Sequence, residues 1–135
     1  MIMTKKNLIL IGFTLFFFLI AIPAYSGMLD GKTFVGKNGH LGKDGSGSDE
    51  IKFENGKFTS IICSEKYGFG DADYTTKADG DKVFFTADTY SEKYGRMSYS
   101  GFVKGNDISA NYFWYEKGKY ENPEQVKWFK GSVKN

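Results

Sequence analysis

The sequence predicts an all-β protein, an eight-stranded antiparallel up-and-down barrel that follows an N-terminal signal helix. Apolar and polar residues alternate with a period of two along most of residues 27–135, and turn dipeptides separate these runs. No long apolar stripe repeats with the 3.6-residue period of a helix. We expect the sheet to close because closure removes the two unpaired edges of an open sheet.

The strands are expected in eight runs, with no helix between residues 49 and 134. The runs are residues 31–36, 49–54, 57–64, 71–78, 82–90, 96–104, 107–116 and 125–134.

Two kinds of connection join these runs. Three are the dipeptides Asn55-Gly56, Asp79-Gly80 and Gly105-Asn106, which suit type I′ or II′ hairpin turns because their residues tolerate positive φ. Alternate connections of a meander lie at opposite ends of the sheet, so the longer ones should share one rim. These are residues 37–48, 65–70, 91–95 and 117–124.

The register of the third hairpin can be checked against the side chains that it places opposite one another. With Gly105-Asn106 as the loop, Lys104 faces Asp107 and Tyr99 faces Tyr112, so opposite charges meet and aromatic rings meet. The same count sets Gly101 opposite Ala110 and Met97 opposite Trp114, and the first hairpin sets Phe53 opposite Phe58.

Residues 1–26 have the pattern of a signal peptide. Lys5 and Lys6 precede an apolar stretch over residues 8–22, and small residues follow it before Gly27. We therefore expect cleavage before Gly27, which leaves residues 27–135 as a single barrel domain that is exported to the periplasm or the extracellular space.

The alternative is an uncleaved segment that anchors the protein to the membrane. The apolar stretch ends at Pro23 and is shorter than the roughly 20 residues that a transmembrane helix needs. We therefore expect contact with the membrane only through this segment, if it is retained.

Charge and cysteine content restrict the partners. The 18 basic residues include Lys5 and Lys6, so the mature part has 16 basic and 16 acidic residues and a net charge of zero. We expect no nucleic-acid partner, because such partners need clustered Lys and Arg. The single cysteine, Cys63, excludes an internal disulfide and is interpreted as a small apolar strand residue.

The residue types that carry enzymatic or metal chemistry are sparse. The single histidine, His40, lies in the Gly-rich 37–48 loop, where we expect a solvated side chain. Without a His beside a nucleophile, and without Cys companions for zinc, neither a catalytic triad nor a zinc site is indicated. The acidic residues of 44–50 do not have the spacing of a calcium loop. We expect no enzyme activity, no metal and no cofactor.

The architecture resembles that of calycins, the lipocalin and avidin type of secreted meander barrel. The resemblance is carried by the signal segment, eight strands, the longest loop between the first two strands and long loops at one rim. The run Leu29-Asp30-Gly31-Lys32-Thr33-Phe34 occupies the place where lipocalins have Gly-x-Trp, with Phe34 in place of Trp. The resemblance to calycins implies a barrel that holds one small molecule.

Aromatic side chains are the best candidates for ligand contact. Aromatic residues with a polar tip can line an apolar pocket and orient a molecule in it. The alternative is that the same side chains fill a small barrel. The candidates facing inward are Tyr74, Phe85, Tyr99, Tyr112, Trp114 and Phe129.

A short repeat supplies further candidates at the rim. The run Ser64-Glu65-Lys66-Tyr67-Gly68 recurs as Ser91-Glu92-Lys93-Tyr94-Gly95, and a similar run ends at Tyr120. We therefore add the rim tyrosines Tyr67, Tyr94 and Tyr120.

These features lead to two hypotheses. The first is an exported, non-enzymatic protein that binds a small apolar or aromatic ligand at the long-loop rim. The alternative is a solid-core β module that mediates protein–protein interaction in the cell envelope, through outward aromatic residues. The residues expected to carry this interaction are Phe102, Phe113 and Trp128, or the rim tyrosines, and Phe84 is also expected to face outward.

Overall fold

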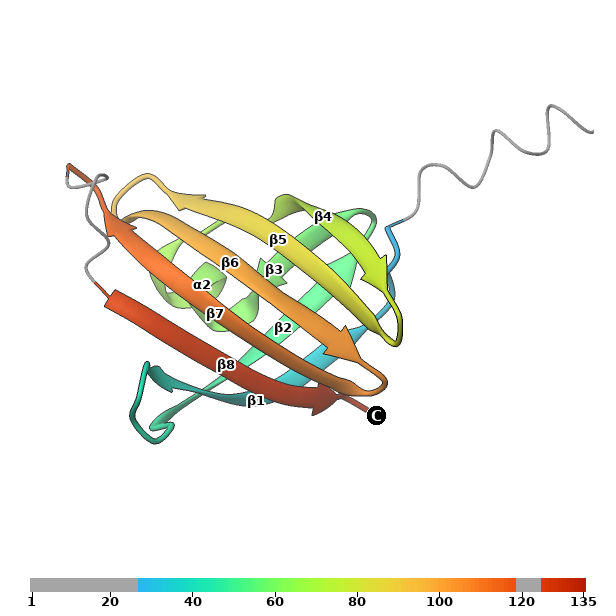
Figure 1. The fold of residues 1–135 in the computed structure, drawn as a ribbon. Coiled ribbons are helices and arrows are strands. Elements are labelled where there is room, and N and C mark those ends of the chain that lie inside the picture. Colours follow the sequence, from blue (N-terminus) through green and yellow to red (C-terminus); the bar gives the residue numbers. More distant parts are fainter. Residues whose placement is uncertain (1–26, 119–124) are drawn as a thin grey trace, which may run out of the picture.

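The computed structural model describes residues 27–118 and 125–135, which form a closed antiparallel barrel of eight strands in up-and-down order (Figure 1). This confirms the predicted fold class, and the architecture is compatible with that of calycins. The expected signal helix lies outside the described residues. The elements are β1 (Thr33–His40), β2 (Gly47–Glu54), β3 (Lys57–Ser60), α2 (Ile61–Tyr67), β4 (Ala72–Asp79), β5 (Lys82–Ser91), β6 (Gly95–Lys104), β7 (Asp107–Glu116) and β8 (Gln125–Val133).

The hairpins have nearly the predicted registers. In the third, Tyr99 pairs with Tyr112 and Lys104 with Asp107, as cross-strand complementarity predicted. The second turn lies one residue later than predicted, with Gly80-Asp81 as the loop, because Asp79 pairs with Lys82. Gly80 has a φ of +60°, which suits the first loop position of a type II′ turn.

Of the longer connections, those between β1 and β2, β3 and β4, and β5 and β6 are fully described and lie at one end of the barrel, on the left in Figure 1, while the tight turns lie at the other. We call these ends the long-loop rim and the tight-turn end. The first strand is longer than predicted, so its loop to β2 shrinks to residues 41–46 and His40 ends the strand. The polar residues after Gly36 were mistaken for loop, although their backbone pairs with both β2 and β8.

A helix replaces the end of the third predicted strand, contrary to the expectation of no helix after residue 49. β3 ends at Ser60, and α2 carries the chain from β3 toward β4. This connection, residues 61–71, is the longest one described, which corrects the expectation that the longest lies between β1 and β2. Within the described residues, no helix has the length and hydrophobicity needed to cross a membrane.

Contacts at both ends explain why α2 forms. Asp49 on β2 accepts a hydrogen bond from the backbone N–H of Ile62 (3.1 Å) and another from the Ser60 hydroxyl, so its carboxylate satisfies the helix N-terminus. At the other end Gly68, at a φ of +72°, donates its N–H to the carbonyl of Ser64. Because Asp49 is distant in sequence, the local pattern could not reveal this support.

The tight-turn half of the barrel is solid. Phe53 lies at its centre, with ring centroids 4.9–6.1 Å from those of its aromatic neighbours. These neighbours are Phe34, Phe58, Tyr74 and Phe85. Phe129 on β8 is also fully buried. Buried aromatic rings therefore pack closely in this half of the interior.

The chain segment before β1 closes the tight-turn end. Leu29 is buried there, and the Tyr74 hydroxyl donates a 2.7 Å hydrogen bond to Asp30 while it accepts one from the N–H of Leu29. Asp30 also accepts hydrogen bonds from the N–H groups of Gly27 and Gly56. A side chain at Gly27 would collide with the Tyr74 hydroxyl, so the segment packs closely against the barrel.

This closure predicts a loss of stability in alkali. Burial and the hydrogen bond to Asp30 raise the pKa of Tyr74 to about 12. Since an unfolded tyrosine titrates near pH 10, the unfolded chain loses this proton first, and stability falls as pH rises from about 10 toward 12. We expect Tyr74→Phe to reduce this loss of unfolding free energy by roughly 1 kcal/mol. The effect is smaller than the pKa shift alone implies, because solvent screens a half-exposed site.

Urea denaturation between pH 8 and pH 12 measures this effect. The variant should still lose stability through Tyr99 and Tyr112, whose pKa values burial also raises. An identical pH dependence in both proteins would contradict the assigned role of Tyr74.

Candidate ligand-binding pocket

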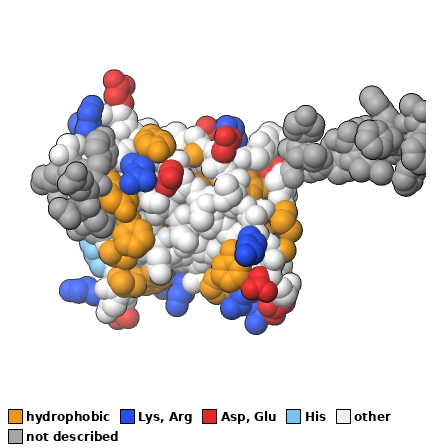
Figure 2. Space-filling model, turned by 45° about the horizontal axis from the view of Figure 1, so that its top comes forward, with side chains coloured by type: hydrophobic (Ala, Val, Ile, Leu, Met, Phe, Trp, Pro, Cys, Tyr) orange, Lys and Arg blue, Asp and Glu red, His pale blue; other side chains and the backbone are white. Residues whose placement is uncertain are grey.

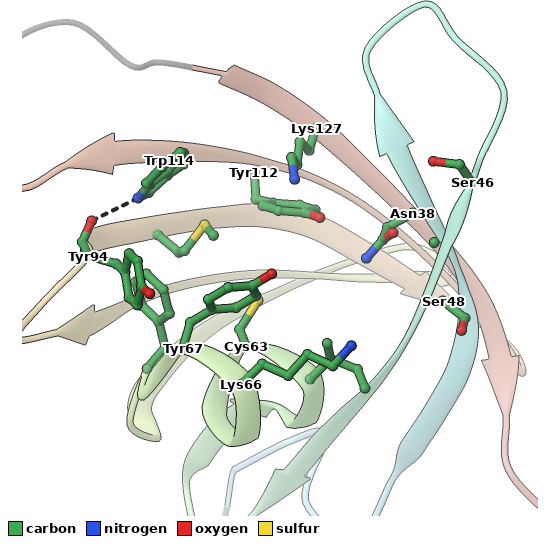
Figure 3. A pocket seen from close by; sticks show the side chains of 14 residues that line it. Asn38, Ser46, Ser48, Cys63, Lys66, Tyr67, Tyr94, Tyr112, Trp114 and Lys127 are labelled. Carbon is green, nitrogen blue, oxygen red and sulfur yellow. Dashed lines mark hydrogen bonds between the residues drawn. The ribbon is translucent and has the colours of Figure 1, made fainter.

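A pocket of about 510 Å³ opens at the long-loop rim (Figure 3). Its walls come from α2, from strands β6 to β8 and from the β1–β2 hairpin. The interior is thus divided into a solid tight-turn half and a hollow rim half. A volume of this size lies within the range of pockets that hold small organic molecules.

Helix α2 forms one wall. It presents Ile62, Cys63, Lys66 and Tyr67 to the pocket. The helix is fixed by Asp49, as described above, so these four side chains have a supported position. They combine an apolar surface with a thiol, a hydroxyl and a positive charge.

The opposite wall consists of side chains that alternate inward along three strands. They are Met97 on β6, Tyr112 and Trp114 on β7, and Lys127 on β8. The Trp114 indole N–H donates a 2.8 Å hydrogen bond to the carbonyl of Tyr94, drawn as the dashed line in Figure 3. This bond restricts the orientation of the indole ring at the pocket wall.

The repeated sequence at the rim brings two tyrosines together. The rings of Tyr67 and Tyr94 meet edge to face, with centroids 5.4 Å apart. Ser91 connects the two segments, because its hydroxyl donates to the carbonyl of Tyr67 and accepts from the N–H of Tyr94. Both tyrosines line the pocket, so the repeat positions a matched aromatic pair there.

The β1–β2 hairpin forms the polar side of the pocket. Asn38 points inward, and Gly47 lies between the pocket-lining residues Ser46 and Ser48. The loop of this hairpin is held by Trp128, whose indole N–H donates to the carbonyls of His40 and Lys43 at 3.0 Å each.

One polar group from the α2 wall and one from the opposite wall are uncharged at neutral pH. Burial raises the pKa of the Cys63 thiol and that of the Tyr112 hydroxyl, so both groups keep their protons. Beneath them the Tyr99 ring stacks on Tyr112 with centroids 4.9 Å apart, and its hydroxyl donates toward the Cys63 sulfur at 3.9 Å. Burial also raises the pKa of Asp49, while the hydrogen bond from Ser60 acts in the opposite direction.

The structure places the predicted site residues in two groups. Tyr67, Tyr94, Tyr112 and Trp114 line the pocket. Tyr120 lies outside the described residues. The remaining four are part of the packed interior or of the tight-turn closure and do not line the pocket; they are Tyr74, Phe85, Tyr99 and Phe129.

Sequence reasoning missed several pocket residues. Cys63 was interpreted as a strand residue, whereas it lies on α2. Lys127 and Asn38 had a usable signal, since both lie on the inward face of their strands. Lys127 is two residues before Phe129 on β8, and Asn38 is four residues after Phe34 on β1. Lys66 had none, because the helix that carries it was not predicted.

The outward aromatic residues have contacts within the chain. The Phe102 ring packs against Phe84, and the Lys82 ammonium lies 4.5 Å from its centroid. Phe113 packs against Tyr115, and Trp128 supports the β1–β2 loop. On the face in Figure 2, hydrophobic side chains form separate groups at the left and right, with mostly polar side chains and backbone between them.

The described residues therefore offer a built pocket for binding. Among them, no three His, Cys, Asp or Glu side chains lie close enough together to hold a metal ion. Comparisons of the chain with protein-family models, curated proteins and solved structures gave no match.

Proposed function

We propose that this protein is an exported, non-enzymatic binding protein that holds a small ligand with an apolar or aromatic body in the pocket at the long-loop rim. The observation that carries the proposal is the cavity of about 510 Å³. Export rests on the signal-like pattern of residues 1–26. A calycin-like relationship is part of the same proposal and rests on the order of the strands in the barrel and on the pocket at the long-loop rim.

The lining supports a ligand of this kind. Met97, Ile62 and Trp114 provide an apolar surface, and the protonated hydroxyl of Tyr112 provides a hydrogen-bond donor. A mainly apolar pocket with few well-placed polar groups is typical of small-molecule sites.

The division of the barrel supports the same function. The packed aromatic residues around Phe53 hold the strands in place. The strands β6 to β8 can then present inward side chains to the pocket without filling it. A preformed pocket lowers the entropic cost of binding.

Protein–protein interaction is the second candidate, and it has less support. Phe84 and Tyr90 are 40% and 63% exposed on the outer side of β5. The aromatic residues named for this role, Phe102, Phe113 and Trp128, already pack against other parts of the chain.

Protection of Cys63 tests the proposed function. We expect 2-naphthol, a neutral aromatic probe, to slow the reaction of Cys63 with the neutral thiol reagent 4,4′-dithiodipyridine. At about ten times the Kd the rate should fall roughly tenfold, because only the unoccupied fraction reacts. The dependence of the rate on probe concentration gives Kd.

A relocated thiol provides the control. In the variant Cys63→Ser, Ser100→Cys the thiol lies on the outer face of β6, where Ser100 is exposed, and its reaction rate should not respond to the probe. Equal rates of Cys63 modification with and without saturating concentrations of small aromatic probes would count against the proposal.

A further inference from the structure

We propose that the ligand is an organic anion, with a carboxylate or similar group held between Lys66 and Lys127 and its apolar body at the Trp114 end of the pocket. This rests on the proposed function and names the chemical class of the ligand.

Lys127 occupies an unusual position. It follows the inward alternation of β8, where the next inward residue is the fully buried Phe129, and it pairs across the sheet with Tyr112. Lysine is rarely placed inside a barrel because the loss of hydration of its ammonium group is costly without a partner. Its half-buried side chain lines the pocket, so the charge is directed to the place where a ligand would bind.

Lys66 brings a second positive charge from α2. Figure 3 shows the two amino groups on opposite sides of the pocket, with Tyr112 and Asn38 between them. The hydroxyl of Tyr112 and the amide of Asn38 are hydrogen-bond donors. The two ammonium groups and these donors match the acceptor-only character of a carboxylate.

No acidic side chain of the described residues lines this pocket. Neither lysine has an ion-pair partner among those residues. The nearby carboxylate of Asp49 accepts hydrogen bonds from Ser60 and from the backbone of Ile62 and Glu50. It therefore serves the helix terminus, and no carboxylate within residues 27–118 and 125–135 pairs with either lysine.

The polar and apolar groups are separated along the pocket. In Figure 3, Trp114, Tyr94 and Tyr67 lie at one side, while Asn38, Ser48 and the amino group of Lys66 lie at the other. A molecule with a charged end and an aromatic or aliphatic body satisfies both sides in one orientation.

Three probes that share one body test the charge. We expect 2-naphthoate to bind at least about tenfold more tightly than 2-naphthamide in isothermal titration calorimetry, and 2-naphthylmethylammonium to bind more weakly than both. In the Lys66→Gln, Lys127→Gln double variant, the affinity for naphthoate should fall to that for naphthamide. Lys127→Arg should retain the preference.

The control is Lys130→Gln, since Lys130 lies on the outer face of the same strand and is exposed. It should bind all three probes as the unmodified protein does. Equal affinity for naphthoate and naphthamide would overturn the anion assignment while leaving the proposed function intact. Failure of all three probes to bind would overturn both, because the pocket would then not accept an aromatic body of this size.

Discussion

Replacing Phe53 with alanine should lower the free energy of unfolding by about 4 kcal/mol. Phe53 is fully buried and contacts the aromatic rings of β1, β3, β4 and β5. Its removal leaves a cavity that four rings on separate strands cannot close without moving their backbones. Urea denaturation monitored by circular dichroism measures the change.

A surface phenylalanine provides the matched control. Phe84→Ala removes a ring that is 40% exposed, and we expect a loss below about 1 kcal/mol. Because Phe53 does not line the pocket, folded Phe53→Ala protein should bind 2-naphthol with unchanged affinity. Similar losses for the two variants would contradict a solid tight-turn half.

Replacing Cys63 with phenylalanine should have the opposite effect, a loss of binding with little loss of stability. The new ring would enter the pocket of about 510 Å³ and take up part of the space that the ligand needs. We expect the Kd for 2-naphthol to rise at least thirtyfold, which corresponds to roughly 2 kcal/mol of lost contact. Titration calorimetry measures it.

The Cys63→Ser variant distinguishes the effect of side-chain volume from the effect of losing the thiol. Serine is close to cysteine in size, so the affinity should change by less than about threefold. Stability of Cys63→Phe should fall by no more than about 2 kcal/mol, since the pocket has room for the ring. Unchanged binding by Cys63→Phe would place the ligand elsewhere.

The hairpins could be predicted from the sequence because their determinants are local. In the pair formed by β6 and β7, charge, size and aromatic character all agree on one register. The type II′ turn at Gly80 was predicted one residue early, because Asp79-Gly80 and Gly80-Asp81 both fit hairpin turns.

The helix could not be predicted because its support is distant. Ile61 and Ile62 continue the apolar, β-branched pattern of a strand, whereas the hydrogen bond from the Ile62 N–H to the carboxylate of Asp49 supports the first turn of the helix. The flanking Ser60 and Gly68 are suitable helix-end residues, but such residues are also common in loops.

This omission explains why only part of the candidate site was anticipated. Tyr112 and Trp114 were found because they lie on a strand with a secure register. Lys66 and Cys63 were not, since the pocket wall that carries them is the helix. The alternation of apolar and polar residues also could not show which inward aromatic residues fill the interior and which line the pocket. That difference depends on the three-dimensional arrangement of all eight strands.

The closure at the tight-turn end also bears on the rates at which the proposed ligand would enter and leave the pocket. Because Leu29, Asp30 and Tyr74 block that end, a ligand held in the pocket as proposed would enter and leave through the opening at the long-loop rim. Any side chain that narrows this opening without touching the bound molecule slows both directions equally. Residence time can therefore be lengthened at the mouth without any change in equilibrium affinity.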